Sequence, residues 1–287
     1  MLKQLDIITE KWICPLCTFE NSKHYYRCEI CNLEDDKFHI KYLNEEYKED
    51  DKFQKLYNCF NKVTNILLPV VSCFNEEQFE YNIDILYEYY VQKKIDGIII
   101  INTNCSLDIL FNTLNIMKNK YPDLWIGINI LGYNIFEVLN YLTEITMVNG
   151  LWIDNSYVTD KDYQNIPEII INHFKNISWD GLYFGGTLFK YIKYSGDTNK
   201  ICSNSIPYMD IITTSGDGTG IPIEINKLQN IYNIIDNKRP IALASGITSD
   251  NIDIIKDYVN IFIVGTYIVD DNYNININNL NLLINKL

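Results

Sequence analysis

Short apolar runs and longer amphipathic stretches alternate along residues 61–287. Each run is rich in Ile, Val and Leu without strict polar alternation, which is typical of parallel strands buried on both faces. Most runs precede a stretch with apolar residues at helical spacing, such as 76–94 and 135–147. The pattern predicts strands at Ile66–Ser72, Gly97–Asn102, Trp125–Leu131, Gly150–Asp154, Gly181–Phe184, Asp210–Thr214, Pro240–Ala244 and Ile261–Val264.

Eight strand-then-helix units in about 225 residues are typical of a (β/α)8 TIM barrel, an α/β fold. An open doubly wound sheet is the alternative, because only the number of repeats separates the two folds. Ahead of the barrel, residues 9–34 hold four cysteines, and residues 35–60 form a charged stretch typical of a linker. The sequence therefore predicts a small module, a linker and a barrel at 61–287.

The net charge of −13 argues against nucleic acid or an anionic membrane as a partner. Binding to phosphate groups without sequence preference requires a basic face. We see no apolar run of membrane-spanning length and no signal segment. The cysteines outside the first module are scattered, which suits reduced thiols. We expect an intracellular protein, cytoplasmic or nuclear, with neither nucleic acid nor membrane as a partner.

Four cysteines near the N-terminus have the spacing of a zinc site. Cys14 and Cys17 form one Cys-x2-Cys pair, and Cys28 and Cys31 form a second pair ten residues later. Two such pairs can place four thiolates around one structural Zn²⁺, and so small a module needs the metal in order to fold. Four unrelated thiols are the alternative.

Residues between these cysteines resemble the zinc fingers of the Ran-binding-protein type. Trp12 and Asn21 fit that family, and Thr18, Phe19 and Ile30 fit its ubiquitin-binding branch, known as NZF. The resemblance implies that ubiquitin or a ubiquitinated protein is the partner of the finger. The RNA-binding branch uses arginines, of which the whole chain has two. The alternative for the two apolar residues is that they cover the finger's own core.

Gly-rich segments follow the last three predicted barrel strands. Backbone N–H groups in such turns can approach an anion closely, and a following helix N-terminus adds a favourable dipole. Three consecutive segments predict a phosphate-binding site for a phosphorylated small molecule, although any single glycine is equally well explained by the steric needs of a tight turn. The residues predicted to bind the phosphate are Gly216, Gly218, Thr219, Ser245, Gly246, Gly265 and Thr266.

Few side chains suited to proton transfer fall at the predicted strand ends. Asp154 follows the fourth strand and Lys190 the fifth, while Asp217 lies in the loop after the sixth. We expect Asp154 to be a general base and Lys190 to stabilise negative charge on an enolate or alkoxide. An ordinary ion pair between loops is the alternative, and for Asp217 a turn residue beside glycine. Asn102 and Asn129 are expected to orient hydroxyl groups of a sugar-like ligand.

Residues 210–220, 242–251 and 263–266 resemble the BtpA/SgcQ family, a group of ribulose-phosphate-binding-type barrels. Residues 127–131 and Lys190 also fit that family. The resemblance implies the barrel and its phosphate site. It assigns no reaction.

Similar strand endings occur in phosphoribosylanthranilate isomerase, but that pattern ends the sixth strand in an aspartate. Thr213 and Thr214 stand there in this chain, so this activity is not expected. Cys73 does follow the first strand, as the base of that enzyme does. Free cysteines are usually buried, and we expect Cys73 to be an ordinary buried thiol.

Two function classes follow from these observations. The first is an isomerase, lyase or hydrolase acting on a phosphosugar or phosphoribosyl compound, brought to ubiquitinated partners by the finger. The second is a non-catalytic ubiquitin-binding adaptor, in which the barrel is a ligand sensor or scaffold. Polar groups that converge at one face of a barrel favour the enzyme.

Overall fold

The computed structural model describes residues 11–13, 20–22, 52–73, 76–103, 105–142 and 148–287. The chain divides into two compact units, Met1–Asp50 and Asp51–Leu287. In the first unit, strands β1 (Lys11–Ile13) and β2 (Glu20–Ser22) pair antiparallel. The assigned finger residues lie outside the described ranges, so the zinc site and the ubiquitin surface stay predictions. These residues are Cys14, Cys17, Thr18, Phe19, Cys28, Ile30 and Cys31.

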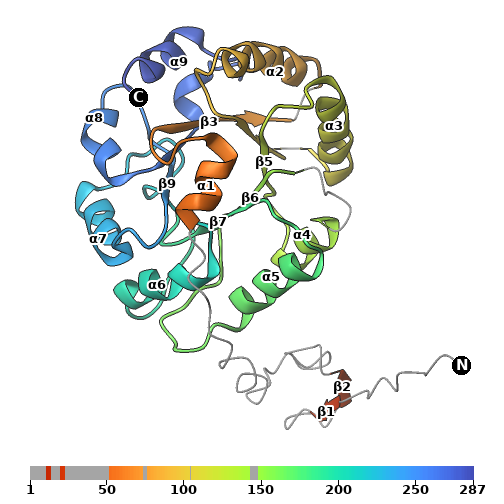
Figure 1. Cartoon of the computed structure of the whole chain (residues 1–287), viewed down its shortest axis with the longest axis vertical. Helices are drawn as coiled ribbons and strands as arrows, with labels where there is room; N and C mark the ends of the chain where they lie inside the picture. Colours follow the sequence, from red (N-terminus) through yellow and green to blue (C-terminus); the bar gives the residue numbers. More distant parts are fainter. Residues whose placement is uncertain (1–10, 14–19, 23–51, 74–75, 104, 143–147) are drawn as a thin grey trace, which may run out of the picture. The chain divides into compact units, whose positions relative to one another are not determined.

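The second unit is a closed barrel of parallel strands, in which β10 pairs with β3 and so joins the last strand to the first (Figure 1). This closure confirms the predicted TIM barrel and excludes the open sheet, whose edge strands would be unpaired. Every apolar run predicted as a strand forms one. The strands are β3 (Ile66–Ser72), β4 (Ile98–Ile101), β5 (Ile126–Asn129), β6 (Gly150–Ile153), β7 (Leu182–Gly186), β8 (Ile211–Thr214), β9 (Ile241–Ala244) and β10 (Ile261–Val264).

Helices surround the strands as an outer layer (Figure 1). Among the described residues, no helix is both long and apolar enough to cross a membrane. The outer helices are α2 (Glu76–Val91), α3 (Leu107–Lys120), α4 (Ile135–Leu142), α5 (Asn165–Asn176), α6 (Thr198–Ser205), α7 (Ile225–Ile235), α8 (Ile252–Ile255) and α9 (Ile277–Ile284), with short 3-10 helices η1 (Ile206–Tyr208), η2 (Lys256–Tyr258) and η3 (Thr266–Ile268).

Side chains of each strand alternate between the inside of the barrel and the layer beneath the helices. On β3, for example, Ile66 and Leu68 belong to the inner core, whereas Leu67 and Val71 belong to the outer one. Both faces are apolar, so the strands read as continuous apolar runs in the sequence. The alternation also decides which side chains at the strand ends face the barrel mouth.

Helix α1 (Lys52–Phe60) closes the amino-terminal end of the barrel, where Figure 1 shows it across the ring of strands. Leu56 is fully buried in the inner core, and the ring of Phe60 lies 5.0 Å from that of Trp125. Lys55 Nζ lies 2.7 Å from Asp210 Oδ2. The sequence assigned residues 52–60 to the linker. The structure corrects this boundary: the charged run at 44–52, which precedes the helix, hid the packing role of its apolar residues.

Candidate functional site

A cavity of about 750 Å³ opens at the carboxyl ends of the barrel strands. One part of its wall is polar: Asp154 and Lys190 contribute side chains, and residues 245–248 and 265–266 contribute to the facing surface. Another part is apolar and comes from β3, β10 and residues 269–275. The cavity lies where TIM-barrel enzymes generally place their active sites.

Asp154 directly follows β6 and lines the cavity. Asn129 Nδ2 donates a hydrogen bond to its Oδ1 at 3.2 Å and another to Trp152 O at 2.9 Å. Burial raises the pKa of the Asp154 carboxyl above its ordinary value, whereas the charge of Lys190 and the hydrogen bond from Asn129 lower it. A desolvated carboxylate with a raised pKa is the kind of group that general-base catalysis uses.

Lys190 lies in the loop after β7 and lines the same cavity. Its backbone N–H donates to Ser215 Oγ at 2.8 Å, which joins this loop to the one after β8. Burial lowers the pKa of the Lys190 ammonium group, and the charge of Asp154 raises it. The structure thus brings Asp154 and Lys190 together, while their catalytic roles stay predictions.

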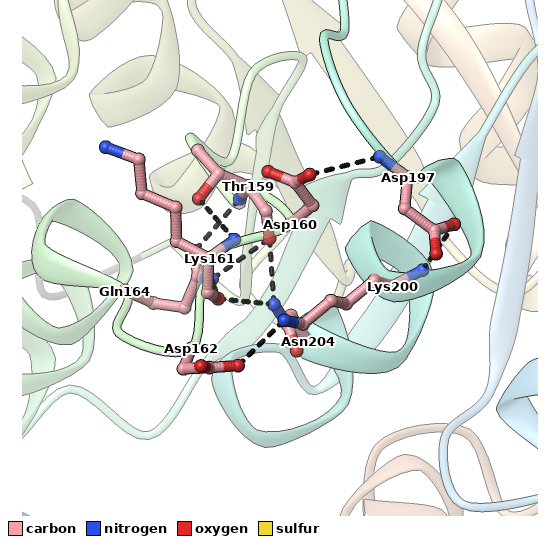
Figure 2. Close-up of polar contacts among 8 residues, drawn as sticks. All are labelled: Thr159, Asp160, Lys161, Asp162, Gln164, Asp197, Lys200 and Asn204. Atoms are coloured by element: carbon pink, nitrogen blue, oxygen red, sulfur yellow. Dashed lines mark hydrogen bonds and ion pairs between the residues drawn. The ribbon is translucent and has the colours of Figure 1, made fainter.

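The loop after β6 is held against α6 by a polar network (Figure 2). Asn204 Nδ2 donates to Thr159 O at 2.9 Å and to Lys161 O at 2.7 Å. Lys200 Nζ lies 2.8 Å from Asp162 Oδ1. Several bonds along one loop fix its backbone, and a fixed backbone preorganises the carboxylate with which the loop begins.

Gly246, Gly265 and Thr266 line the cavity from the segments that follow β9 and β10. Gly246 has a φ of +67°, and a Cβ there would lie 2.3 Å from the backbone of Ile221, so this position requires glycine. A Cβ on Gly265 would meet Val70 Cβ at 3.5 Å, an ordinary contact. Space beside Gly265 is therefore open to a ligand or to a larger side chain.

Hydrogen bonds between neighbouring loops continue this surface toward β8. Ser245 Oγ accepts from Gly220 N at 2.9 Å and donates to Gly218 O at 2.7 Å. Tyr191 OH accepts from Thr219 N at 2.9 Å, which connects the loop of Lys190 to the same surface. Thr219, Gly220 and Ser245 all line the cavity. The loops after β7, β8 and β9 thus support one another around the mouth.

Strand order explains why the two polar surfaces face one another. In the closed barrel the order is β10-β3-β4-β5-β6-β7-β8-β9, so β6 and β10 are four strands apart in either direction. Asp154 after β6 therefore lies across the mouth from Gly265 after β10. A small molecule that touches both surfaces must span the cavity.

Asp217 and Asn102 do not line the cavity, contrary to expectation. The Asp217 side chain is exposed. Burial lowers the pKa of Lys227 on the outer helix α7, and the charge of Asp217 acts in the opposite direction, so Asp217 interacts with that helix. Asn102 is buried, and both its amide atoms bond the backbone of Leu131: Nδ2 donates to Leu131 O at 3.0 Å, and Oδ1 accepts from Leu131 N at 2.6 Å. Asn102 fixes the loop after β5 instead of binding a ligand.

Two of the predicted phosphate glycines have packing roles instead. A Cβ on Gly216 would lie 2.2 Å from Ile221 O, and one on Gly218 would lie 2.9 Å from Ile221 Cδ1. Both glycines are buried and neither lines the cavity. Glycine at these positions lets the loop after β8 fold onto itself, which is the steric alternative that the sequence left open.

Asn129 is the predicted ligand-binding amide that does reach the cavity. Its side chain is 1% exposed, and its Oδ1 has no hydrogen-bond partner in the described structure. A buried acceptor without a partner is costly and therefore calls for an explanation, of which a role in ligand binding is one. Asn129 therefore holds Asp154 through Nδ2 and keeps one acceptor unused beside it.

Cys73 lies in the outer core beneath the helices and not at the cavity. Burial and its contact with Cys105 raise the pKa of its thiol. An un-ionised, buried thiol is a poor base, which agrees with the expectation of an ordinary buried cysteine. Within the described residues, no group of three or more His, Cys, Asp or Glu side chains is placed to hold a metal ion.

Sequence reasoning missed one wall of the cavity. Residues Val269, Tyr273 and Ile275 lie in the segment after β10, and Asn82 comes from helix α2. These four residues are neither glycines nor charged, so they were not selected as candidates. A residue of a helix was also not expected to reach the cavity at the strand ends. The helical spacing of α2 could only have shown that Asn82 faces the barrel.

No protein-family model and no curated protein matches this chain. Among solved structures, phosphoribosyl anthranilate isomerase from Thermus thermophilus has a TM-score of 0.51 and 10% identity, over 76% of this chain and 97% of that chain. The YdjI aldolase from Escherichia coli K12 has a TM-score of 0.50 and 15% identity, over 76% of this chain and 81% of that chain. At these identities the likeness shows the fold alone.

Proposed function

We propose that the barrel binds a phosphorylated small molecule and catalyses a proton transfer on it, as an isomerase, lyase or hydrolase of a phosphosugar or phosphoribosyl compound. One observation carries the proposal: Gly246 and Gly265 line the same cavity as Asp154 and Lys190, with Asp154 across the mouth from Gly265. Backbone N–H groups suit a phosphate, and a carboxylate beside an ammonium group suits proton transfer.

Each side chain has a defined role in this proposal. Asp154 takes a proton from a carbon or hydroxyl group of the ligand, since burial raises its pKa toward neutrality. Lys190 remains protonated and stabilises the negative charge that develops on the neighbouring oxygen. Asn129 keeps the Asp154 carboxylate oriented through the bond from Nδ2 to Oδ1. The phosphate anchors the ligand away from the reacting atoms, so its binding energy positions them.

Native mass spectrometry of the full chain with a mixture of phosphosugars and phosphoribosyl compounds tests this function. We expect at least one compound to bind at one per chain, and its dephosphorylated counterpart to bind far more weakly. Enzyme assays on the bound compound then follow proton exchange by NMR in deuterated water. Binding that is indifferent to the phosphate group would contradict the proposal.

The N-terminal finger supports a separate proposal. Cys14, Cys17, Cys28 and Cys31 bind one Zn²⁺, and the finger recruits the barrel to ubiquitin or ubiquitinated proteins; the support is the spacing of the cysteines and the likeness to NZF fingers. We expect one zinc per chain by elemental analysis. Removal of the zinc by a chelator should leave the barrel's thermal transition in place, because the barrel has its own core.

Thr18, Phe19 and Ile30 carry the proposed ubiquitin contact. A patch this small predicts a dissociation constant of about 100 µM, and Phe19→Ala should abolish binding while the zinc content stays unchanged. Titration of labelled ubiquitin, followed by NMR, measures the affinity of the unsubstituted chain and of Phe19→Ala, and elemental analysis measures the zinc content of each. If ubiquitin binds but the chain turns over no phosphorylated ligand, we conclude that the protein is a non-catalytic adaptor. The barrel is then a ligand sensor or a scaffold. The BtpA-type resemblance suits either outcome.

A further inference from the structure

The cavity extends beyond the interior of the barrel. Val70 and Ile263 line it from the inner face of β3 and β10, while their neighbours Val71 and Val264 line it from the outer face. Both faces of the same pair of strands therefore contribute to one cavity. We call the part outside the barrel wall the side branch; it is lined by Val71, Asn82, Val264, Tyr267, Val269, Tyr273 and Ile275.

Lining residues of the side branch are almost all apolar or aromatic. Its amide, Asn82, is 3% exposed and has both polar atoms bonded to backbone: Nδ2 donates to Tyr273 O at 2.8 Å, and Oδ1 accepts from Ile275 N at 2.9 Å. The branch thus differs from the rest of the cavity, whose lining includes the charged residues Asp154 and Lys190. Apolar surface of this kind gains free energy by receiving an apolar group and excluding water.

The outer wall of the branch is preformed. Residues Val269 and Ile275 pair as an antiparallel bridge, and Asp270 closes the turn between them by accepting from Asn272 N at 2.8 Å and Asn274 N at 2.9 Å. Asn82 joins this turn to α2 through its hydrogen bonds with Tyr273 O and Ile275 N. Because these hydrogen bonds already order the wall, little conformational entropy is lost when a ligand binds. The free energy gained from apolar contact therefore contributes to affinity.

The branch adjoins the proposed phosphate site. Val264 is followed directly by Gly265 and Thr266, and all three line the cavity. A group attached to a phosphate at Gly265 can therefore pass either toward Asp154 or along the outer face of β10. A ligand that fills both directions must carry polar and apolar parts.

We infer that the ligand of this barrel is a phosphate ester with an apolar or aromatic group, and that this group occupies the side branch beneath residues 269–275. The inference rests on the proposed function, since it assumes that the phosphate binds at Gly246 and Gly265. It narrows the substrate class: simple phosphosugars, which are polar throughout, leave the branch empty. The apolar group sets specificity, whereas Asp154 and Lys190 act on the polar part.

A series of phosphate monoesters tests the inference on the full chain. Inorganic phosphate, methyl phosphate, butyl phosphate and phenyl phosphate are titrated by calorimetry. Each fully buried methylene tightens binding about fourfold, so butyl phosphate should bind at least about tenfold more tightly than methyl phosphate. Phenyl phosphate should show a similar gain. Equal affinities along the series would overturn the inference while leaving the proposed phosphate site intact.

Variants locate the apolar group. Val269→Phe and, independently, Ile275→Phe fill the branch and should reduce the advantage of butyl over methyl phosphate to about twofold, with the affinity for methyl phosphate nearly unchanged. Ile254→Phe, on the exposed face of α8, is the matched control and should keep the full advantage. An unchanged advantage in a folded branch variant overturns the inference. Failure of every phosphate, including the inorganic ion, to bind overturns the proposed function itself.

Discussion

The two ends of the barrel are built from the same strands but differ in how they are closed. At the amino-terminal end, Leu56 and Phe60 of α1 fill the opening, and Lys55 pairs with Asp210 at 2.7 Å. At the carboxyl end, a cavity of about 750 Å³ remains, and the charges of Asp154 and Lys190 face it. At the amino-terminal end the charges of Lys55 and Asp210 pair beneath a helix, whereas at the carboxyl end the charges of Asp154 and Lys190 line a cavity.

The difference separates stability from function. Closure by α1 buries apolar side chains and compensates the Asp210 carboxylate, which also accepts from Tyr183 N at 2.9 Å. The open end keeps partly desolvated charges and an unpaired acceptor on Asn129, which cost free energy and serve no packing purpose. Substitutions at the two ends should therefore change different measured quantities.

Asp154→Asn should have the largest effect on function. It removes the proposed base while keeping the shape of the side chain, so turnover of the substrate should fall about 10²–10⁴-fold. The melting temperature should change by only a few degrees. Asp217→Asn is the matched control, since that carboxylate lies outside the cavity and turnover should be unchanged. Loss of turnover in Asp217→Asn instead would restore the role expected from the sequence.

The pH profile of turnover tests the same pair of charges. Burial raises the pKa of Asp154, so the base becomes protonated, and turnover falls, at a pH above the usual range of aspartate. Burial lowers the pKa of Lys190, so its charge is lost, and turnover falls again, at a pH below the usual range of lysine. We expect a bell-shaped profile narrower than ordinary carboxylate and ammonium groups would give. A flat profile from pH 4 to pH 10 would exclude both roles.

Leu56→Ala should have the largest effect on stability. Leu56 is fully buried in the inner core, so truncation leaves a cavity and should cost about 2–5 kcal/mol of the free energy of unfolding. Urea denaturation measures this cost. The affinity for phosphate at the other end should remain within about twofold, since no residue of α1 lines the cavity. A large loss of affinity would show that the two ends are coupled.

Sequence patterns predicted the fold because apolar burial governs it. Each strand is apolar on both faces, so the runs at 66–72 and 261–264 have the same boundaries in the structure as in the prediction. Helix α1 was assigned to the linker because a charged run at 44–52 comes directly before its apolar residues, such as Leu56 and Phe60. Its burial depends on the opening of the barrel, which no local pattern contains.

The site was predictable only where strand geometry determines it. Asp154 directly follows a strand, and the inward position at its end follows from alternation. Asn102 directly follows β4, where alternation places it on the outer side with Ile98 and Ile100, and its amide bonds the backbone of Leu131. The side branch depends on Asn82 and on the turn after β10. Such contacts join segments distant in sequence, and their residue types carry no signal.

Gly265→Val should have an intermediate effect, confined to the open end. A Cβ at this position makes an ordinary contact with Val70, so Gly265→Ala should fold normally and bind phosphate nearly as well. The branched side chain of valine fills more of the space in front of the backbone N–H groups, and phosphate affinity should fall at least about tenfold. Calorimetry measures the affinity. Gly246→Ala, in contrast, should destabilise the fold, because its φ is positive and its Cβ would overlap the backbone of Ile221.

Tyr191→Phe should give the smallest effect and the finest test of how the open end is held. Tyr191 OH accepts from Thr219 N at 2.9 Å and donates to Thr219 Oγ1 at 3.2 Å, although the side chain is 72% exposed. Water can replace an exposed hydrogen bond at little cost, so the melting temperature should stay the same. The bond nevertheless joins the loop of Lys190 to the loop after β8, and without it the polar wall is less well ordered. Phosphate affinity should fall about twofold to threefold, measured by calorimetry beside Tyr57→Phe as the control, since Tyr57 is exposed on α1 and lies outside the cavity. An affinity equal to that of the unsubstituted chain would mean that the other interloop bonds, from Lys190 N to Ser215 Oγ and from Gly220 N to Ser245 Oγ, hold the open end by themselves.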